Sequence, residues 1–194
     1  MTVLAFLVAA LWVAVLALAG LVWILLRQVG VLYERVSPMG ALMDSAGPDI
    51  GEPGPVFRLE SLTGGEVAIG AGGRAQLVFF LSPTCPVCKQ LIPVLASLRR
   101  DEKAWLDVVL ASDGARDRHE DFIRRAKLSD FPYVLSADLG MTYRVQRLPF
   151  AVLTDRDGVV RAKGLVNNRE QLESLFNALR AGVASLQQYV AARA

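Results

Sequence analysis

The chain has 194 residues, 53% of them hydrophobic and 21% charged, and a formal net charge of +2 at pH 7. This length suits one domain of ordinary size with an appendage. Basic residues are interleaved with acidic ones, as in the Arg-Arg-Asp-Glu-Lys run of residues 99–103, which reads as the solvated end of a helix. The charge pattern therefore gives no sign of a nucleic-acid partner.

The first 26 residues carry no charged side chain and consist mainly of Leu, Val, Ala, Trp, Phe and Ile. A helix of that length reaches about 39 Å, which exceeds the roughly 30 Å hydrocarbon core of a bilayer. Residues 1–26 are therefore predicted to form a transmembrane anchor. Trp23 and Tyr33 lie near its far end, where a membrane interface favours amphipathic rings.

A cleaved signal peptide is the alternative, because residues 17–19 (Ala-Leu-Ala) have the small side chains of a cleavage site. The basic segment that begins a signal peptide is absent, and cleavage would leave an apolar start, so an uncleaved anchor is favoured. Arg27 and Arg35 follow the span, with Glu34 between them. The positive-inside rule taken alone would leave the soluble domain in the cytoplasm.

Residues 27–50 contain scattered glycines and prolines and no sustained hydrophobic period, which predicts a linker. Alternating apolar residues at 56–62, a Thr-Gly-Gly turn at 63–65 and a second short strand at 66–69 then predict a β-hairpin. The continuous apolar run of residues 76–81, bounded by turn residues, predicts a central strand that is buried on both faces.

The two cysteines, Cys85 and Cys88, stand where this apolar run ends and a helical pattern begins. The positive end of the helix dipole and the unpaired N–H groups of a first turn favour a thiolate over a thiol. Cys85 is therefore the candidate nucleophile. Cys88 is the candidate resolving thiol, because thiol exchange passes through a mixed disulfide that a second thiol within reach releases.

Two alternatives to redox chemistry are less well supported by the sequence. A zinc site requires four ligands, and the rest of the chain offers only His119 and carboxylates, so no metal is expected. A static disulfide across so short a loop would remove little conformational entropy from the unfolded chain. A redox-active pair is therefore the favoured interpretation, and no cofactor is expected.

Apolar residues recur every three or four positions after the dithiol, which predicts a helix with one buried face and a kink at Pro93. A strand is predicted at 106–111, a charged helix at 116–126 and a short strand at 133–136. His119 falls in the charged helix and is expected to be a solvated surface residue.

The last third of the chain reads as strand, turn, strand and helix. Strands predicted at 150–154 and 159–163 flank an Asp-Arg-Asp-Gly turn, which is a strong hairpin signal. An amphipathic helix begins at Arg169 and can cover one face of a sheet. The chain is therefore predicted to have an α/β fold.

The dithiol, the helix that contains Pro93 and a later Leu148-Pro149 before a strand hairpin together resemble the thioredoxin superfamily over residues 51–188. The resemblance implies a central mixed sheet flanked by helices, preceded here by one transmembrane helix. It also implies a cis Pro149 that lies against the dithiol; without it, Pro149 would read as an ordinary proline at the start of a strand. The residues implied to bind the substrate are Pro149, Leu148, Pro86 and Val87.

A narrower resemblance concerns the branch of the superfamily. The Gly-x-Pro-x-Pro-x-Phe-x-Leu motif of residues 51–59 resembles the membrane-anchored TlpA and peroxiredoxin-like branch. The anchor, the segment Phe-Leu-Ser-Pro-Thr-Cys-Pro-Val-Cys-Lys of residues 80–89 and the chain length resemble the MauD family of methylamine utilisation accessory proteins. This implies an inner-membrane thiol:disulfide oxidoreductase with a periplasmic domain. Its implied protein substrate is the disulfide-rich small subunit of methylamine dehydrogenase.

Two positions depart from the thioredoxin pattern. Phe79 stands where thioredoxins carry a buried Asp, and Thr84 stands where they carry a Trp. The missing carboxylate leaves open how Cys88 loses its proton. It also argues against a general disulfide reductase of the thioredoxin kind.

Three other functions stay open at this point. The first is a cytochrome c maturation reductase of the same fold, and the second is a redox-inert assembly platform. The third is a peroxidase, which is disfavoured because the chain lacks the Pro-x-x-x-Thr/Ser-x-x-Cys loop of peroxiredoxins. Neither the direction of electron flow nor the redox partner follows from the Pro86-Val87 pair between the cysteines.

Overall fold

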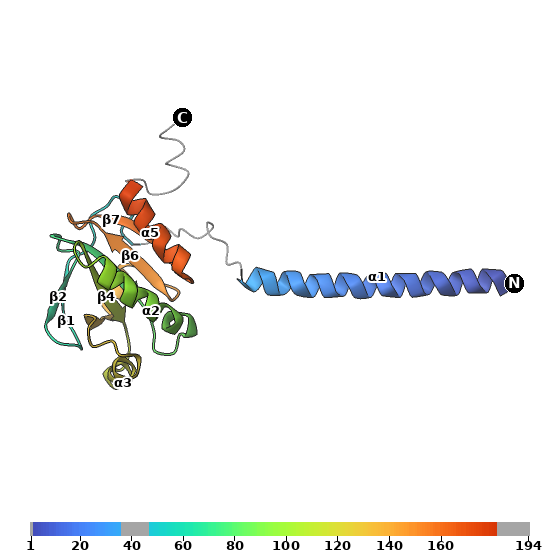
Figure 1. Ribbon diagram of the computed structural model, residues 1–194, viewed down its shortest axis with the longest axis horizontal. Coiled ribbons are helices and arrows are strands. Elements are labelled where there is room, and N and C mark those ends of the chain that lie inside the picture. Colours follow the sequence, from blue (N-terminus) through green and yellow to red (C-terminus); the bar gives the residue numbers. More distant parts are fainter. Residues whose placement is uncertain (1, 36–46, 182–194) are drawn as a thin grey trace, which may run out of the picture. The chain divides into compact units, whose positions relative to one another are not determined.

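A computed structural model describes residues 2–35 and 47–181 of the chain (Figure 1). The chain divides into two units, Met1–Asp44 and Ser45–Ala194, which are taken separately. Residues 36–46 of the predicted linker and residues 182–188 of the predicted domain lie outside the described residues.

The first unit is one helix, α1 (Thr2–Arg35). Its segment Thr2–Trp23 has 22 residues and a mean hydropathy of 2.7, so it is long and apolar enough to cross a membrane. The large apolar side chains described along this segment are exposed, including Trp12 and Trp23, as expected for a helix that faces lipid. The helix continues beyond the span to Arg35; the side chains of Arg27, Tyr33 and Arg35 lie outside the described residues.

The second unit contains a five-stranded mixed sheet with the strand order β5-β4-β3-β6-β7. The central strand β3 pairs in parallel with β4 and antiparallel with β6. Its central place confirms the prediction made from the apolar run. The strands are β3 (Ala75–Phe80), β4 (Leu106–Ser112), β5 (Tyr133–Leu135), β6 (Phe150–Thr154) and β7 (Val160–Leu165).

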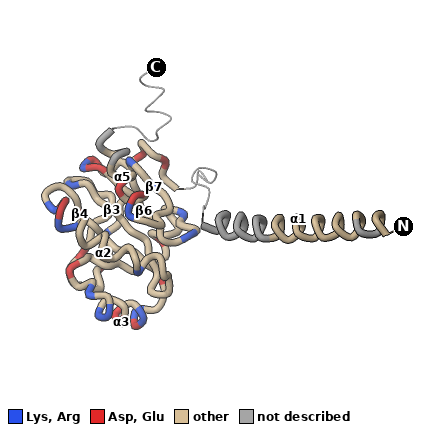
Figure 2. The backbone as a smooth tube through the Cα atoms, turned by 45° about the vertical axis from the view of Figure 1, so that its right-hand side comes forward, with Lys and Arg blue, Asp and Glu red and all other residues tan. Residues whose placement is uncertain are grey.

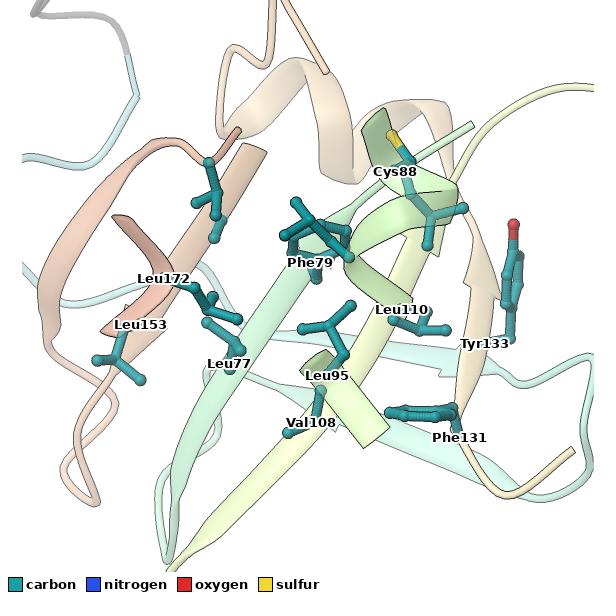
Figure 3. Close-up of a cluster of buried hydrophobic side chains, with 14 of the residues drawn as sticks. Leu77, Phe79, Cys88, Leu95, Val108, Leu110, Phe131, Tyr133, Leu153 and Leu172 are labelled. Atoms are coloured by element: carbon teal, nitrogen blue, oxygen red, sulfur yellow. The ribbon is translucent and has the colours of Figure 1, made fainter. Parts of the chain in front are cut away.

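Successive side chains of β3 point to opposite faces of the sheet. Side chains on both faces are buried, so both faces are covered by other parts of the chain. Leu77 and Phe79 belong to a buried cluster that includes side chains of α2 (Pro86–Asp101), α3 (Arg116–Ala126) and α5 (Arg169–Ala181); part of this cluster is drawn in Figure 3. Val78 and Phe80 belong to a second cluster, on the side of α4 (Ala137–Thr142). Arginines are interleaved with Asp and Glu along α3 (Figure 2), as its sequence predicts.

The predicted N-terminal hairpin is confirmed as β1 (Phe57–Glu60) and β2 (Glu66–Ile69), which pair antiparallel. Ser61, at the end of β1, is buried, and its hydroxyl accepts a hydrogen bond of 3.0 Å from the backbone N–H of Tyr133. This contact ties the hairpin to β5.

Three details of the structure differ from the predicted elements. Helix α4 was not predicted, because six residues are too few to display a hydrophobic period. Ser136, predicted as the end of a strand, instead caps this helix by accepting a 3.0 Å hydrogen bond from the N–H of Leu139. Strand β7 begins at Val160 rather than Val159, because Val159 belongs to the turn closed by Asp155.

The predicted exposure of His119 is wrong, because this side chain is only 3% exposed. Its Nδ1 lies 2.8 Å from the hydroxyl of Tyr133, and its Nε2 lies 2.8 Å from the carbonyl oxygen of Asp113. The charges around it in α3 suggested solvent, but His119 is on the side of the helix that packs on the sheet together with Phe122 and Ile123.

Candidate redox site

A short loop of residues 82–85, called the dithiol loop below, lies between the end of β3 and the start of α2. The pairing of β3 with both neighbours ends at Phe80, opposite Ala111 and Phe150. In the loop, the N–H of Cys85 donates to the carbonyl of Ser82 at 3.1 Å, and the Ser82 hydroxyl accepts from the N–H of Thr84 at 3.3 Å. These turn contacts bring the chain from the sheet into the helix within a few residues.

Cys85 is the N-cap residue of α2. Its backbone is extended, and its Sγ accepts a hydrogen bond of 3.2 Å from the N–H of Cys88. Pro86 at the first position of the helix suits the turn, because the N–H that it lacks would have no partner there. Cys85 is half-buried, and an N–H donor points at its sulfur.

Cys85 and Cys88 form a disulfide, with their Cα atoms 5.3 Å apart. Cys88 is fully buried, in the same apolar cluster as Phe79 of β3 and Leu91 of α2 (Figure 3). Among the residues whose burial is described, the buried polar side chains are Ser61, Ser112, His119 and Thr154. No buried carboxylate therefore stands near Cys88 in this part of the chain.

The Leu148–Pro149 peptide bond is cis, as the resemblance implies. Pro149 is buried and Leu148 is exposed. Phe150, the first residue of β6, lies opposite Phe80, the last residue of β3. The loop before β6 and the loop after β3 therefore lie side by side at the same end of these two strands. The topology thus brings the Leu148–Pro149 loop and the dithiol loop together.

Ser112 is a buried polar residue beside this loop that sequence reasoning missed. Its hydroxyl donates a hydrogen bond of 2.7 Å to the carbonyl of Leu81, the residue that precedes the dithiol loop. A serine at the end of an apolar strand carries no signal in the sequence, because its partner lies 31 residues away.

The described residues contain no group of three or more His, Cys, Asp or Glu side chains that could hold a metal ion. The site consists of the two cysteines, the cis-proline loop and backbone hydrogen bonds. The chemistry available to it is thiol–disulfide exchange.

No protein-family model matches the chain. Solved structures of similar fold include StoA of Bacillus subtilis, which is 24% identical with a TM-score of 0.56 over 65% of this chain and 98% of StoA. They also include the thioredoxin domain of a thiol-disulfide oxidoreductase of Bacteroides vulgatus, 22% identical with a TM-score of 0.58 over 70% of this chain and 98% of that domain. These similarities show the thioredoxin-like fold, as predicted.

Curated relatives are much more similar in sequence. The methylamine utilization protein MauD of Paracoccus versutus is 48% identical over 184 residues, which cover 94% of this chain and 92% of the relative. MauD of Methylorubrum extorquens is 47% identical over 186 residues, which cover 94% and 90%. The similarity includes the N-terminal helix as well as the thioredoxin-like domain, because it spans nearly the whole chain. The chain therefore belongs to the MauD family of thioredoxin-like proteins.

Proposed function

We propose that the chain is a membrane-anchored thiol:disulfide oxidoreductase that acts on a protein substrate through Cys85 and Cys88. The proposal rests mainly on the different surroundings of the two cysteines. Cys85 is half-buried and accepts an N–H hydrogen bond, whereas Cys88 is fully buried one turn later. Such a pair has one thiol placed to attack or be attacked and one placed to resolve.

The exchange proceeds in two steps that balance. A substrate thiolate attacks Sγ of Cys85, the Cys85–Cys88 bond breaks, and Cys88 leaves as a thiolate that takes up a proton. A second substrate thiolate then attacks the substrate sulfur of the mixed disulfide and releases Cys85 as a thiolate. Two electrons pass from the substrate to the dithiol, and the same steps in reverse reduce a substrate disulfide. A separate redox partner restores the starting state in either direction.

The apolar surroundings of Cys88 affect the resolving step. Phe79 and Leu91 in its cluster offer no group that could hold its proton. Desolvation disfavours the charged form of a buried thiol. We therefore expect the resolving step to be slow compared with a site that carries a buried base, and the mixed disulfide to live correspondingly longer.

The substrate surface that we propose surrounds Cys85. Pro86 and Leu148 are exposed, Val87 is half-buried, and Pro149 is buried. The carbonyl of Pro149 is already bonded to the N–H of Val166 at 3.1 Å. The backbone of Leu148 therefore remains to pair with an extended substrate segment.

The substrate that we propose is the small subunit of methylamine dehydrogenase. The curated relatives are named methylamine utilization proteins, and the match covers almost the full chain. A disulfide-rich periplasmic subunit suits an exchange site on a domain that the anchor holds at the inner membrane, on its periplasmic side. Cytochrome c maturation and a redox-inert platform predict different partners, so the same experiment separates them.

The test is to trap the mixed disulfide in cells that grow on methylamine. In Cys88→Ser the Cys85 thiolate can still attack a substrate disulfide, and no internal thiol then releases the mixed disulfide, so the substrate should accumulate on Cys85 as a band that disappears with dithiothreitol. Cys85→Ser is the matched control and should trap little. Capture of the dehydrogenase small subunit supports the proposal, and capture of a cytochrome or its maturation factor supports the reductase instead. No adduct, with normal dehydrogenase assembly, would favour the platform.

A further inference from the structure

The carbonyl of Leu81 is the first one beyond the hydrogen-bond ladder of β3. The residue pairing of β3 ends at Phe80 on both sides, and Leu81 is only 1% exposed. Its N–H donates to the carbonyl of Ala111 at 3.0 Å. Its carbonyl still needs a donor, because a buried backbone group without a partner is costly. The hydroxyl of Ser112 supplies that donor at 2.7 Å.

Ser112 is itself held in place. Its side chain is buried, and its carbonyl accepts a hydrogen bond of 2.9 Å from the N–H of Ser136 at the start of α4. The carbonyl of the next residue, Asp113, lies 2.8 Å from Nε2 of the buried His119. The end of β4 is therefore fixed to α3 and to the end of β5. These contacts hold the Ser112 hydroxyl in position to bond to the carbonyl of Leu81.

The dithiol loop passes this constraint on to Cys85. Only Ser82, Pro83 and Thr84 separate Leu81 from Cys85, and the N–H of Cys85 is bonded to the carbonyl of Ser82. A shift of the Leu81 carbonyl would therefore be transmitted through three residues to the N-cap position that Cys85 occupies. The thiolate at this position depends on its alignment with that turn, including the 3.2 Å contact with the N–H of Cys88.

We propose that Ser112 is a positioning residue for Cys85, acting through the carbonyl of Leu81. The inference rests on the proposed redox function of the dithiol. Ser112 does not take part in exchange. Its hydroxyl fixes where the loop enters α2 and so stabilises the reduced, thiolate form of Cys85 relative to the disulfide.

A matched control is present in the same domain. Ser61 is also a buried serine whose hydroxyl bonds to backbone, accepting from Tyr133 at 3.0 Å and from Thr63 at 3.2 Å. It belongs to the β1–β2 hairpin and contacts β5, not the dithiol loop. Removing either hydroxyl leaves buried backbone groups unpaired, so both losses should lower stability. Only the loss at Ser112 should change the chemistry of Cys85.

The experiment measures two properties of the full chain in detergent. The first is the equilibrium in which the protein disulfide and two glutathiones give the dithiol and glutathione disulfide. The second is the rate at which Cys85 reacts with iodoacetamide across pH. Ser112→Ala should shift the equilibrium about two- to fivefold toward the disulfide, the size expected from weaker helix-terminus stabilisation. It should slow alkylation near neutral pH by a similar factor and move the pH profile upward.

Ser61→Ala should leave both properties at their wild-type values, and Ser112→Thr, which keeps a hydroxyl, should restore them. If Ser112→Ala does not fold, Ser112→Val provides the comparison, because valine matches threonine in shape and lacks the hydroxyl. Wild-type values in Ser112→Ala or Ser112→Val, or an equal shift in Ser61→Ala, would overturn the positioning role. A wild-type disulfide that neither glutathione nor excess dithiothreitol reduces in the folded protein would instead overturn the proposed redox function.

Discussion

Nδ1 of His119 lies 2.8 Å from the hydroxyl oxygen of Tyr133, and both side chains are buried. Burial raises the pKa of the Tyr133 hydroxyl well above its usual range, so the hydroxyl stays neutral at any working pH. It therefore has one hydrogen to share with its neighbours, and His119 is one of its partners. The pair joins α3 to the edge strand β5.

Replacing His119 by alanine should destabilise the domain, because the Tyr133 hydroxyl and the Asp113 carbonyl both lose a partner. The expected loss is about 2–3 kcal/mol in the free energy of unfolding. Urea unfolding of the full chain in detergent measures it. Arg118→Ala is the control on the same helix; its side chain is exposed, so it should change stability by less than about 0.5 kcal/mol. Equal effects of the two substitutions would mean that the buried contacts of His119 contribute nothing.

Asp155 gives the domain a pH-dependent contribution to stability. Burial opposes its ionisation, but the N–H groups of Val159 and Asp157 and the guanidinium of Arg161 outweigh burial and lower the pKa of this carboxyl. A pKa that is lower in the folded state than in the unfolded state stabilises the fold above the unfolded value of 3.8. This contribution is lost as the pH falls through the folded pKa.

Asp155→Asn should therefore cost about 1 kcal/mol at pH 7, and the difference from wild type should shrink as the pH falls below 3.8 and through the folded pKa of Asp155. Unfolding measured from pH 7 to pH 2.5 tests this. Asp157→Asn is the control, since the carboxylate of Asp157 is exposed and an exposed charge contributes little to stability. A difference between Asp155→Asn and wild type that is undiminished at the lowest pH would contradict the ionic origin of the effect.

The two thiols of the reduced protein should differ in reactivity. Cys85 is half-buried and faces the N–H of Cys88, whereas Cys88 has no exposed surface. Cys85 should therefore react with iodoacetamide near neutral pH at least about tenfold faster than Cys88. Peptide mapping after brief alkylation shows which cysteine carries the label. Equal labelling, or labelling of Cys88 first, would reverse the roles assigned to them.

The orientation of the anchor is a separate prediction. Arg27 and Arg35 after the span favour a cytoplasmic domain, but disulfide exchange on a periplasmic substrate requires the opposite side. A phosphatase that is active only in the periplasm, fused after Ala194, should be active. A silent fusion that is present in the membrane at normal amounts would place the domain in the cytoplasm.

The sequence predicted most of the fold because its signals are local. The apolar run of β3, the Asp-Gly turn before β7 and the helical period after Cys88 each act within a few residues, and each predicted element is present. Both cysteines were recognisable for the same reason. For most of the predicted elements, the predicted and observed boundaries differ by one or two residues.

The features that the sequence did not reveal depend on contacts between distant residues. His119 looked solvated among the charges of α3, and only the packing of α3 on the sheet buries it against Tyr133. Ser112 matters because the β3 ladder ends one residue before Leu81, and register is not readable from a single strand. A residue whose role is to satisfy a distant backbone group has no pattern of its own in the sequence.

The central claim is that the Cys85–Cys88 pair acts on the methylamine dehydrogenase small subunit. The most direct measurement replaces both cysteines by serine in the chromosome and follows the disulfide content and amount of that subunit in cells induced with methylamine. We expect the double variant to reach the membrane in normal amounts, while the subunit lacks its native disulfides and active dehydrogenase falls at least about tenfold. A subunit with all native disulfides and wild-type dehydrogenase activity would show instead that the dithiol is dispensable.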